Sequence, residues 1–373
     1  MLELARILAG PWIGQTLADL GADVIKVESP EGDDTRRWGP PFVQGPSGEN
    51  LDSAYFHSCN RGKRSVIADF RTSEGQQIVR RLAQKSDVLI ENFKVGGLAK
   101  YGLDYASLHA INPRLIYCSV TGFGQTGPYA HRAGYDFIIQ GMSGVMDLTG
   151  EPDGGPQKIG VAFADIFTGT YGTIAVMAAL AQRERTGLGQ HVDMALLDTM
   201  VGVMANQALN YFVSGEAPRR MGNAHPNIVP YQTFELRDGH VIIAVGNDAQ
   251  FARLCEFLGV PHFATDPKYS SNAARVENRA DIVARLSALL STRSRAELLS
   301  AMEERGIPAG PINTIADVFA DPQVLHRQMR VDLNVPALRT PIQFSDAQLS
   351  LQRPAPRLGE HTAEILAELE TPR

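Results

Sequence analysis

One carboxylate in an apolar setting, Asp165, is the residue in this chain best placed to do chemistry. It lies in residues 160–169, where small and apolar residues surround it and no other charged residue occurs. An apolar stretch of helical length, residues 166–181, follows directly. Two roles fit this pattern. Asp is a favoured N-cap, which accepts a hydrogen bond from a helix N–H, and a carboxylate can also act as a covalent nucleophile.

The residues alone favour the cap for Asp165, because helix caps of this type are common. The nucleophile has physical support as well. The partial positive charge of a helix N-terminus would keep the carboxylate ionised, and neighbouring backbone N–H groups could hold an oxyanion that forms beside it. Both interpretations stay open on this pattern alone.

Residues 122–127 match the Gly-x-Gly-x-x-Gly pattern of dinucleotide-binding sites and follow a predicted strand. Pro128 comes next, and residues 129–134 have the composition of a loop. A dinucleotide site needs a helix there, because the N–H groups of its first turn hold the pyrophosphate. We therefore interpret the segment as a glycine-rich loop that lines a ligand crevice, and not as a nicotinamide site.

Cations are frequent near the predicted strand ends. Residues 60–65 contain Arg61, Lys63 and Arg64 just before a strand, where they form either a solvated turn or an anion contact. Further cations near strand ends or in loops are Arg36, Arg37, Arg71, Lys94 and Lys100. Together these side chains could hold a polyphosphate, because Lys and Arg make charge-assisted hydrogen bonds to phosphate oxygens.

His225 lies in a loop that contains Pro and Asn, and no partner for it is evident in the sequence. A hydrogen-bonded loop histidine is the favoured interpretation. The chain has no Gly-x-Ser-x-Gly elbow and no His-Glu-x-x-His pattern. Serine hydrolases and zinc hydrolases of these types therefore lack support, and no metal site is predicted.

Composition and charge set wider limits. The 35 Lys plus Arg and 41 Asp plus Glu residues give a net charge of −6, which argues against nucleic acid as a partner. The three cysteines are far apart and lack metal-site spacing, which is typical of a reducing compartment. The apolar run of residues 173–181 is too short to cross a bilayer, and the N-terminus has no signal pattern. We expect a cytoplasmic protein without a membrane partner.

The first third of the chain alternates between strand and helix patterns. Strands are predicted over residues 22–28, 65–70, 87–91 and 115–120, with helices over residues 12–20, 73–86 and 105–111. Short apolar strands separated by helices indicate βαβ units and an open parallel α/β sheet. A long helix over residues 166–183, a strand over 190–193 and a second long helix over 194–213 are predicted to follow.

A smaller α+β domain is predicted next. Residues 231–236 and 239–245 have the pattern of two antiparallel strands around a turn at residues 237–239. Helices are predicted over residues 249–258, 275–290 and 294–304, and a last one over residues 361–369. A chain of 373 residues is long enough for about two domains.

A set of motifs in order along the chain resembles the class III coenzyme A-transferases, the family of formyl-CoA transferase and the carnitine CoA-transferases. These motifs are residues 8–11, 21–28, 33–36, 60–65, 91–93, 160–161 with Asp165, 187–190, 306–313 and 358–362. The resemblance covers essentially the whole chain. Four further segments look most like the succinyl-CoA:glutarate (dicarboxylate) branch: residues 35–41, 132–136, 226–232 and 322–326.

The resemblance implies an α/β fold with a large Rossmann-like domain of open parallel sheet and a smaller α+β domain. The large domain would comprise residues 1–215 and a return segment, residues 313–373, and the small domain residues 216–312. Two ring-like subunits would interlock as a homodimer.

The resemblance also implies that Asp165 is the catalytic nucleophile of a double displacement. Asp165 attacks the donor acyl-CoA, which gives a mixed anhydride and CoA thiolate, and the thiolate then forms an aspartyl-CoA thioester. The acceptor carboxylate attacks, a second anhydride forms, and CoA moves onto the new acyl group. One thioester replaces another, so no ATP and no permanently bound cofactor are expected. Coenzyme A thioester enters as substrate.

Nine residues stand at positions where the family contacts CoA: Ala9, Ala68, Arg71, Asn92, Phe93, Lys100, Ala133, Tyr135 and Asp136. Lys100 and Ser29 stand where Arg is frequent in the family, and Lys offers charge without the bidentate fork of Arg. Leu8 stands where formyl-CoA transferase has a glutamine that acts near the anhydride. That departure argues against formyl or oxalyl chemistry.

Two alternatives accompany this prediction. The α-methylacyl-CoA racemases of the same superfamily need a His base where this chain has Tyr135. A tyrosine phenol, with an ordinary pKa of about 10, is a poor base at neutral pH. A non-catalytic acyl-CoA-binding protein is disfavoured because Asp165 is present in its motif. The sequence therefore predicts transfer of CoA from a short acyl-CoA such as succinyl-CoA to a small (di)carboxylate.

Overall fold

The computed structural model describes residues 1–371, and the chain divides into two compact units. The first unit contains residues 1–146, 158–216 and the chain from residue 322 onward. The second contains residues 147–157 and 217–321.

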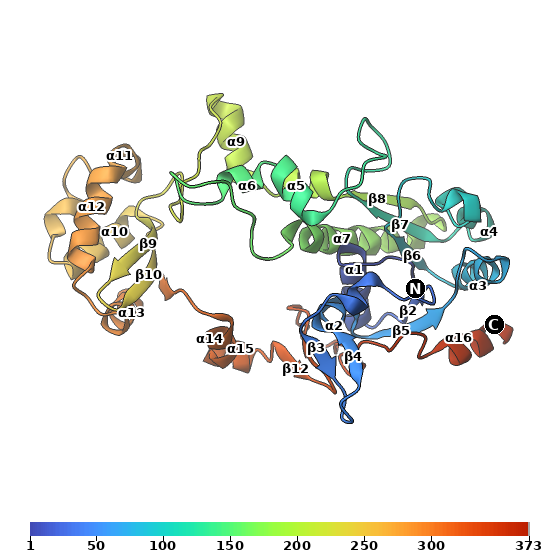
Figure 1. Cartoon of the computed structure of the whole chain (residues 1–373). Coiled ribbons are helices and arrows are strands. Elements are labelled where there is room, and N and C mark those ends of the chain that lie inside the picture. Colours follow the sequence, from blue (N-terminus) through green and yellow to red (C-terminus); the bar gives the residue numbers. More distant parts are fainter. Residues whose placement is uncertain (372–373) are drawn as a thin grey trace. The chain divides into compact units, whose positions relative to one another are not determined.

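The first unit is built on a six-stranded parallel sheet with the order β5-β2-β1-β6-β7-β8 (Figure 1). Its strands are β1 (Leu2–Glu3), β2 (Val24–Glu28), β5 (Lys63–Ile67), β6 (Val88–Glu91), β7 (Ile116–Thr121) and β8 (His191–Ala195). The chain starts in the middle, runs outward through β2 and β5, and resumes on the other side of β1 with β6. This is the Rossmann order, and such sheets bind ligands at the carboxyl ends of the strands where the order reverses. The predicted parallel α/β fold is confirmed.

Helices cover both faces of this sheet. One face carries α3 (Ser73–Gln84), α4 (Tyr105–Ile111) and α16 (Thr362–Glu370), whose apolar side chains form a buried core with the strands. The other face carries α1 (Ala9–Asp19) and α7 (Phe163–Thr186), joined by side chains of α5 (Asp136–Met142) and α8 (Leu196–Gly202). The strands β6 and β7 are largely apolar because both of their faces are buried, whereas β2 and β5 also contain buried charged residues such as Lys26 and Lys63.

The helix α7 is the one helix among residues 1–371 that is long and apolar enough to cross a membrane by length and composition. Val176 and Ala179 on one of its faces are buried in the core against the sheet. Tyr171, Ile174 and Met177 are about half exposed, at 48%, 58% and 48%. Packing against the sheet therefore accounts for only part of the apolar surface of α7.

Shorter elements complete the first unit. These are β3 (Phe42–Gln44), β4 (Asn50–Ser53), α2 (Ala54–Asn60), α9 (Ala205–Ser214), α15 (Pro322–His326), β12 (Arg330–Asp332), β13 (Pro336–Leu338) and the 3-10 helices η1 (Asp34–Arg37) and η2 (Ala99–Tyr101). A further short helix, α6 (Val145–Leu148), lies where the chain passes from one unit to the other. The single helix predicted over residues 194–213 is wrong. Its first residues belong to β8, and α8 and α9 are separated at Val203, with Ala205 at a φ of +43°.

The second unit contains a three-stranded antiparallel sheet of order β11-β10-β9. The strands β9 (Tyr231–Leu236) and β10 (Gly239–Ala244) form the predicted hairpin, and β11 (Ala309–Pro311) pairs with β10. Its helices are α10 (Asp248–Phe257), α11 (Asn272–Glu277), α12 (Arg279–Leu290), α13 (Arg295–Glu304) and α14 (Ile315–Ala320), with the 3-10 helix η3 (Pro261–Ala264). Apolar side chains from the sheet and helices share one core. The predicted smaller α+β domain is confirmed.

The helix predicted over residues 275–290 is interrupted at Asn278, where α11 ends and α12 begins. The side-chain amide of Asn278 donates to the carbonyl oxygens of Lys268 and Ala274, at 3.3 and 2.9 Å. These local hydrogen bonds compete with the helix, which is why Asn favours such breaks.

The basic cluster of residues 60–65 is buried, so both of its predicted roles, a solvated turn and an anion contact, are wrong. Lys63 is fully buried and donates to Oε1 of Glu3 at 2.8 Å. Arg61, 1% exposed, forms an ion pair with Asp19 and donates to the carbonyl oxygen of Leu338 at 2.9 Å. Arg64 reaches Glu364 and Glu368 of α16, at 2.8 and 2.7 Å. Arg61 and Arg64 of this cluster therefore bind the C-terminal part of the chain to the sheet.

Candidate active site

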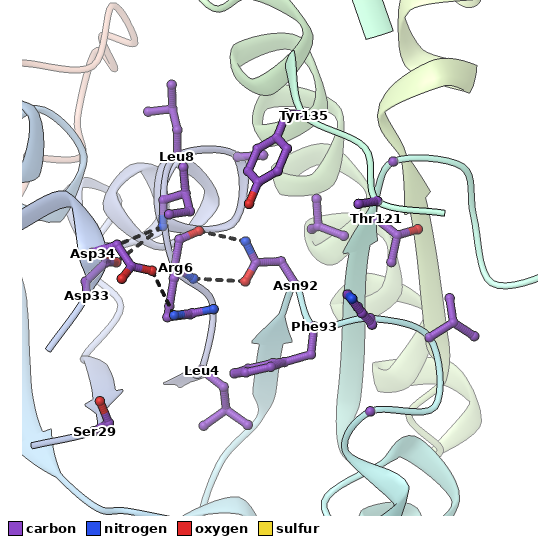
Figure 2. Close-up of a pocket in the computed structure, with 18 of the residues that line it drawn as sticks. Leu4, Arg6, Leu8, Ser29, Asp33, Asp34, Asn92, Phe93, Thr121 and Tyr135 are labelled. Atoms are coloured by element: carbon purple, nitrogen blue, oxygen red, sulfur yellow. Dashed lines mark hydrogen bonds and ion pairs between the residues drawn. The ribbon is translucent and has the colours of Figure 1, made fainter. Parts of the chain in front are cut away.

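A cavity of about 900 Å³ opens at the carboxyl edge of the large sheet. Its walls come from the carboxyl ends of the six strands and the segments that follow them, with further residues from 130–135 and Asp165. Figure 2 shows Leu4, Arg6 and Leu8 after β1 close to Asn92 and Phe93 after β6. These two strands flank the point where the strand order reverses, so the cavity lies where this sheet topology places ligands.

Eight of the nine predicted CoA-contacting residues line this cavity: Ala9, Ala68, Arg71, Asn92, Phe93, Lys100, Ala133 and Tyr135. Leu8, Ser29 and Asp165 line it as well. The ninth residue, Asp136, is not among the lining residues. Its Oδ1 accepts a hydrogen bond from the N–H of Ala164 at 2.8 Å, and its Oδ2 accepts one from Nε2 of Gln140 at 2.7 Å.

Asp165 is the third residue of α7, and the N-cap position is occupied by Ala162. The interpretation of Asp165 as the helix cap is therefore wrong, because Asp136 supplies the capping oxygen from outside the helix. Within residues 1–371, no side chain or backbone N–H donates to the carboxylate of Asp165. This carboxylate is free and borders the cavity.

The ionisation of Asp165 differs from the sequence-based expectation. Burial, and secondly the negative charge of Asp136, raise its pKa to about 7 from an ordinary 3.8. Both effects disfavour the ionised form of the carboxylate, which was expected to be kept ionised by the helix N-terminus. Burial, followed by the charge of Asp165, also raises the pKa of Tyr55, although Tyr55 is not among the residues that line the cavity. Strongly shifted pKa values of this kind cluster at functional sites.

Four of the predicted phosphate-binding cations line the cavity with exposed side chains: Arg37, Arg71, Lys94 and Lys100. Arg36 does not, which corrects its prediction. Its guanidinium is buried against Glu28, with Nε and Nη2 donating at 2.9 and 2.7 Å. Arg6 and Arg132 also line the cavity and were not predicted to bind anions.

The glycine-rich segment of residues 122–127 forms a loop with no helix after it, as predicted. A Cβ atom at Gly122 would lie 2.5 Å from Cα of Gly134, so glycine permits two backbone segments to touch. Thr121 and Gly122 line the cavity. The interpretation as a loop beside a ligand crevice is confirmed.

Ile7, which also lines the cavity, has a φ of +73°. This left-handed conformation costs an L-residue about 1–2 kcal/mol and is rarest for β-branched residues. No sequence pattern marks it, since glycine or asparagine is the usual residue in this conformation.

His225 belongs to the second unit and is a hydrogen-bonded loop histidine, as predicted. Its Nδ1 accepts a hydrogen bond from the N–H of Asn227 at 3.1 Å, and its ring lies 5.1 Å from that of Tyr231.

Together, a sheet of Rossmann order, a free carboxylate and a cation-rich cavity at the reversal point define an α/β protein with a site for an anionic ligand. The chain belongs to CoA-transferase family III, whose family model matches residues 1–362. It is therefore an enzyme that transfers CoA, and a CoA thioester is its substrate.

Named relatives support this assignment. A succinate–glutarate CoA-transferase of Agrobacterium fabrum is 58% identical over 100% of this chain and 94% of its own length. A human succinyl-CoA:glutarate CoA-transferase is 41% identical over 99% of this chain and 84% of its own length. The crystal structure of a CAIB/BAIF family protein from Brucella suis superimposes with a TM-score of 0.89 and 65% identity, covering 99% and 97% of the two chains.

Proposed function

We propose that this CoA-transferase moves CoA from succinyl-CoA, or a similar short acyl-CoA, to a small dicarboxylate, with Asp165 as its nucleophile. The observation that carries the proposal is the free carboxylate of Asp165 beside a cavity with cationic walls. Relatives named as succinate–glutarate and succinyl-CoA:glutarate CoA-transferases support the choice of donor and acceptor. Leu8 supports it too, since formyl-CoA transferases have a glutamine there.

In this mechanism, ionised Asp165 attacks the thioester carbonyl and CoA thiolate leaves. The thiolate then attacks the aspartyl carbonyl of the mixed anhydride, which releases the donor carboxylate and forms an aspartyl-CoA thioester. The acceptor carboxylate then attacks the aspartyl-CoA thioester, so CoA thiolate leaves and a second mixed anhydride forms. The thiolate attacks the acceptor acyl carbonyl of this anhydride, which gives the new acyl-CoA and releases the carboxylate of Asp165. No oxidant, ATP or external proton is consumed, because each step exchanges one acyl bond for another.

The cavity residues would hold the CoA moiety during these steps. Exposed Arg71 and Lys100 supply positive charge for phosphate oxygens. Ala9, Ala68 and Ala133 have short side chains, which leave room for a ligand against the backbone.

We also propose a homodimer of interlocked subunits. Apolar side chains are exposed on several helices of the first unit: Phe137 and Ile138 of α5, Ile174 of α7, and Phe212 and Val213 of α9, the last two at 72% and 86%. Exposed apolar groups of this size mark interfaces in soluble proteins. Light scattering after gel filtration would test the dimer.

The three cysteines are free and buried, which suits the predicted cytoplasmic location.

Two experiments test the reaction. The wild-type enzyme is incubated with succinyl-CoA and a panel of monocarboxylates and dicarboxylates, and new CoA thioesters are identified by mass. Glutarate-sized dicarboxylates should be accepted well and monocarboxylates poorly. Absence of any transfer, together with α-proton exchange into a branched acyl-CoA, would favour a racemase.

The second experiment traps the intermediate. Hydroxylamine added after succinyl-CoA should convert Asp165 to a hydroxamate, detectable in the peptide that contains residues 163–183. The matched control is Asp165→Asn, which keeps the side-chain shape and should give neither adduct nor turnover. An adduct on any other residue would contradict the assignment of Asp165.

A further inference from the structure

The loop between β1 and α1 is held at three successive residues by side chains from elsewhere in the fold. Nζ of Lys26 donates to the carbonyl oxygen of Ala5 at 2.9 Å. The amide of Asn92 spans Arg6, accepting from its N–H at 2.9 Å and donating to its carbonyl oxygen at 2.6 Å. The carboxylate of Asp33 accepts from the N–H of Ile7, at 3.3 and 3.4 Å from its two oxygens. Figure 2 shows the two hydrogen bonds between Arg6 and Asn92, with Asp33 nearby.

Ile7 is the residue of this loop that needs such support. With a φ of +73° it is in a conformation that isoleucine avoids, and residues of this kind persist only where their surroundings impose them. Leu8 and Ala9 follow directly and line the same cavity as Asp165. A relaxed Ile7 would redirect the chain into α1 and shift this wall.

Asp33 is itself fixed from several sides. Its Oδ2 lies 2.9 Å from Nζ of Lys26, which is fully buried. Its Oδ1 accepts from the N–H and the hydroxyl of Thr35, at 3.0 and 2.8 Å. One buried ammonium therefore links the carbonyl of Ala5 to the carboxylate that holds Ile7.

We propose that Asp33, supported by Lys26, is a positioning residue that imposes the left-handed conformation of Ile7. It thereby fixes the cavity wall formed by Leu8 and Ala9 for the reaction at Asp165. The inference rests on the proposed function of this site and adds to it Asp33, which borders the cavity but whose side chain is fully buried and acts through Ile7.

The test uses Ile7→Gly and Ile7→Ala, alone and combined with Asp33→Ala. Both substitutions remove the side chain, but only glycine takes a positive φ freely. We expect Asp33→Ala to lower kcat about tenfold or more, as small misplacements do at active sites. Adding Ile7→Gly should restore much of this loss, whereas Ile7→Ala should not. KM for succinyl-CoA, determined in the same assay, should change less than kcat. Equal kcat values for the two double variants would overturn the inference.

Urea unfolding of the same variants tests the inference without an activity measurement. With Asp33 present, Ile7→Gly should be more stable than Ile7→Ala, because alanine is held in the left-handed region. Without Asp33 this advantage should shrink, because alanine can relax. An advantage of the same size in both backgrounds would overturn the inference.

Two further outcomes are separable. If Asp33→Ala does not fold, the single variants decide: Ile7→Gly must exceed Ile7→Ala in kcat and stability, and equality would overturn the inference. A wild-type enzyme that transfers CoA to no carboxylate would contradict the proposed function, and the urea comparison would still decide the role of Asp33.

Discussion

Oδ1 of Asp136 accepts a hydrogen bond from the backbone N–H of Ala164 at 2.8 Å, one residue before Asp165. This bond satisfies a free donor of the first turn of α7, so the carboxylate of Asp165 is not needed as a cap. The same Asp136 adds a negative charge that helps to raise the pKa of Asp165. One residue therefore begins the helix and makes the carboxylate beside it harder to ionise.

This relationship predicts a pH effect of Asp136→Asn. Asparagine keeps an oxygen for the N–H of Ala164 but removes the charge, so the pKa of Asp165 should fall, although burial, the larger cause, remains. Because the nucleophile must be ionised, activity should rise with pH through about 7 in the wild type. In the variant, the acid limb of kcat/KM against pH should move to lower pH.

Asp136→Ala is the matched control for this prediction. It removes the charge and also the capping oxygen, so it should move the acid limb similarly but lose about 1 kcal/mol of stability as well. An acid limb at the same pH in all three proteins would contradict the influence of Asp136 on Asp165.

A second prediction concerns stability and the charge of Asp165. Its pKa is raised on folding, so the folded state binds the proton more tightly than the unfolded state does. Ionised Asp165 therefore costs stability, and this cost grows as the pH rises from the ordinary 3.8 to about 7. Asp165→Asn should raise the free energy of unfolding at pH 8 by up to about 4 kcal/mol, since one pKa unit is about 1.4 kcal/mol. Urea unfolding at pH 4 and pH 8 would check this, with little difference expected at pH 4.

The sheet could be predicted from the sequence because buried parallel strands are short apolar runs, as in Val88–Glu91. The long-range ion pairs could not. Arg61 and Lys63 look exposed in a local pattern, and their partners Asp19 and Glu3 lie 42 and 60 positions away. The cap of α7 was missed for the same reason, since it comes from 28 positions earlier.

In the candidate site, too, some residues could be predicted from the sequence and others could not. The family resemblance predicted the CoA-contacting residues, eight of which line the cavity. Several cations near strand ends could be expected there as well, because parallel strands end at one edge of the sheet. The buried contacts that hold the loop of Ile7 could not be predicted from the sequence. The conformation of Ile7 depends on Asp33, and Asp33 depends on Lys26, so no local property of residue 7 indicates it.

A third prediction separates the buried cations from those of the cavity. Arg61→Met leaves Asp19 buried without its partner, which should cost about 3–5 kcal/mol of stability while KM for succinyl-CoA stays unchanged. Lys100→Met removes an exposed charge, so stability should change by less than about 0.5 kcal/mol while KM rises. Urea unfolding and steady-state kinetics of both variants would check this. An increase of KM in Arg61→Met without a loss of stability would contradict the structural role of the cluster.

The last prediction concerns the contact between α1 and α7. Gly169 lies one helical turn after Asp165, and a Cβ atom there would meet Cβ of Trp12 at 2.8 Å and the carbonyl oxygen of Ala9 at 2.9 Å. Gly169→Ala should therefore push the two helices apart, which should cost about 1–3 kcal/mol of stability. Because Ala9 and Asp165 both line the cavity, kcat should fall as well, by about tenfold or more.

Gly202→Ala is the control, since nothing lies within 4 Å of a Cβ atom at that helix position. It should leave kcat unchanged and be neutral or stabilising by up to about 1 kcal/mol. Equal stability and equal kcat in the two variants would show that the close approach of α1 and α7 does not matter for the site.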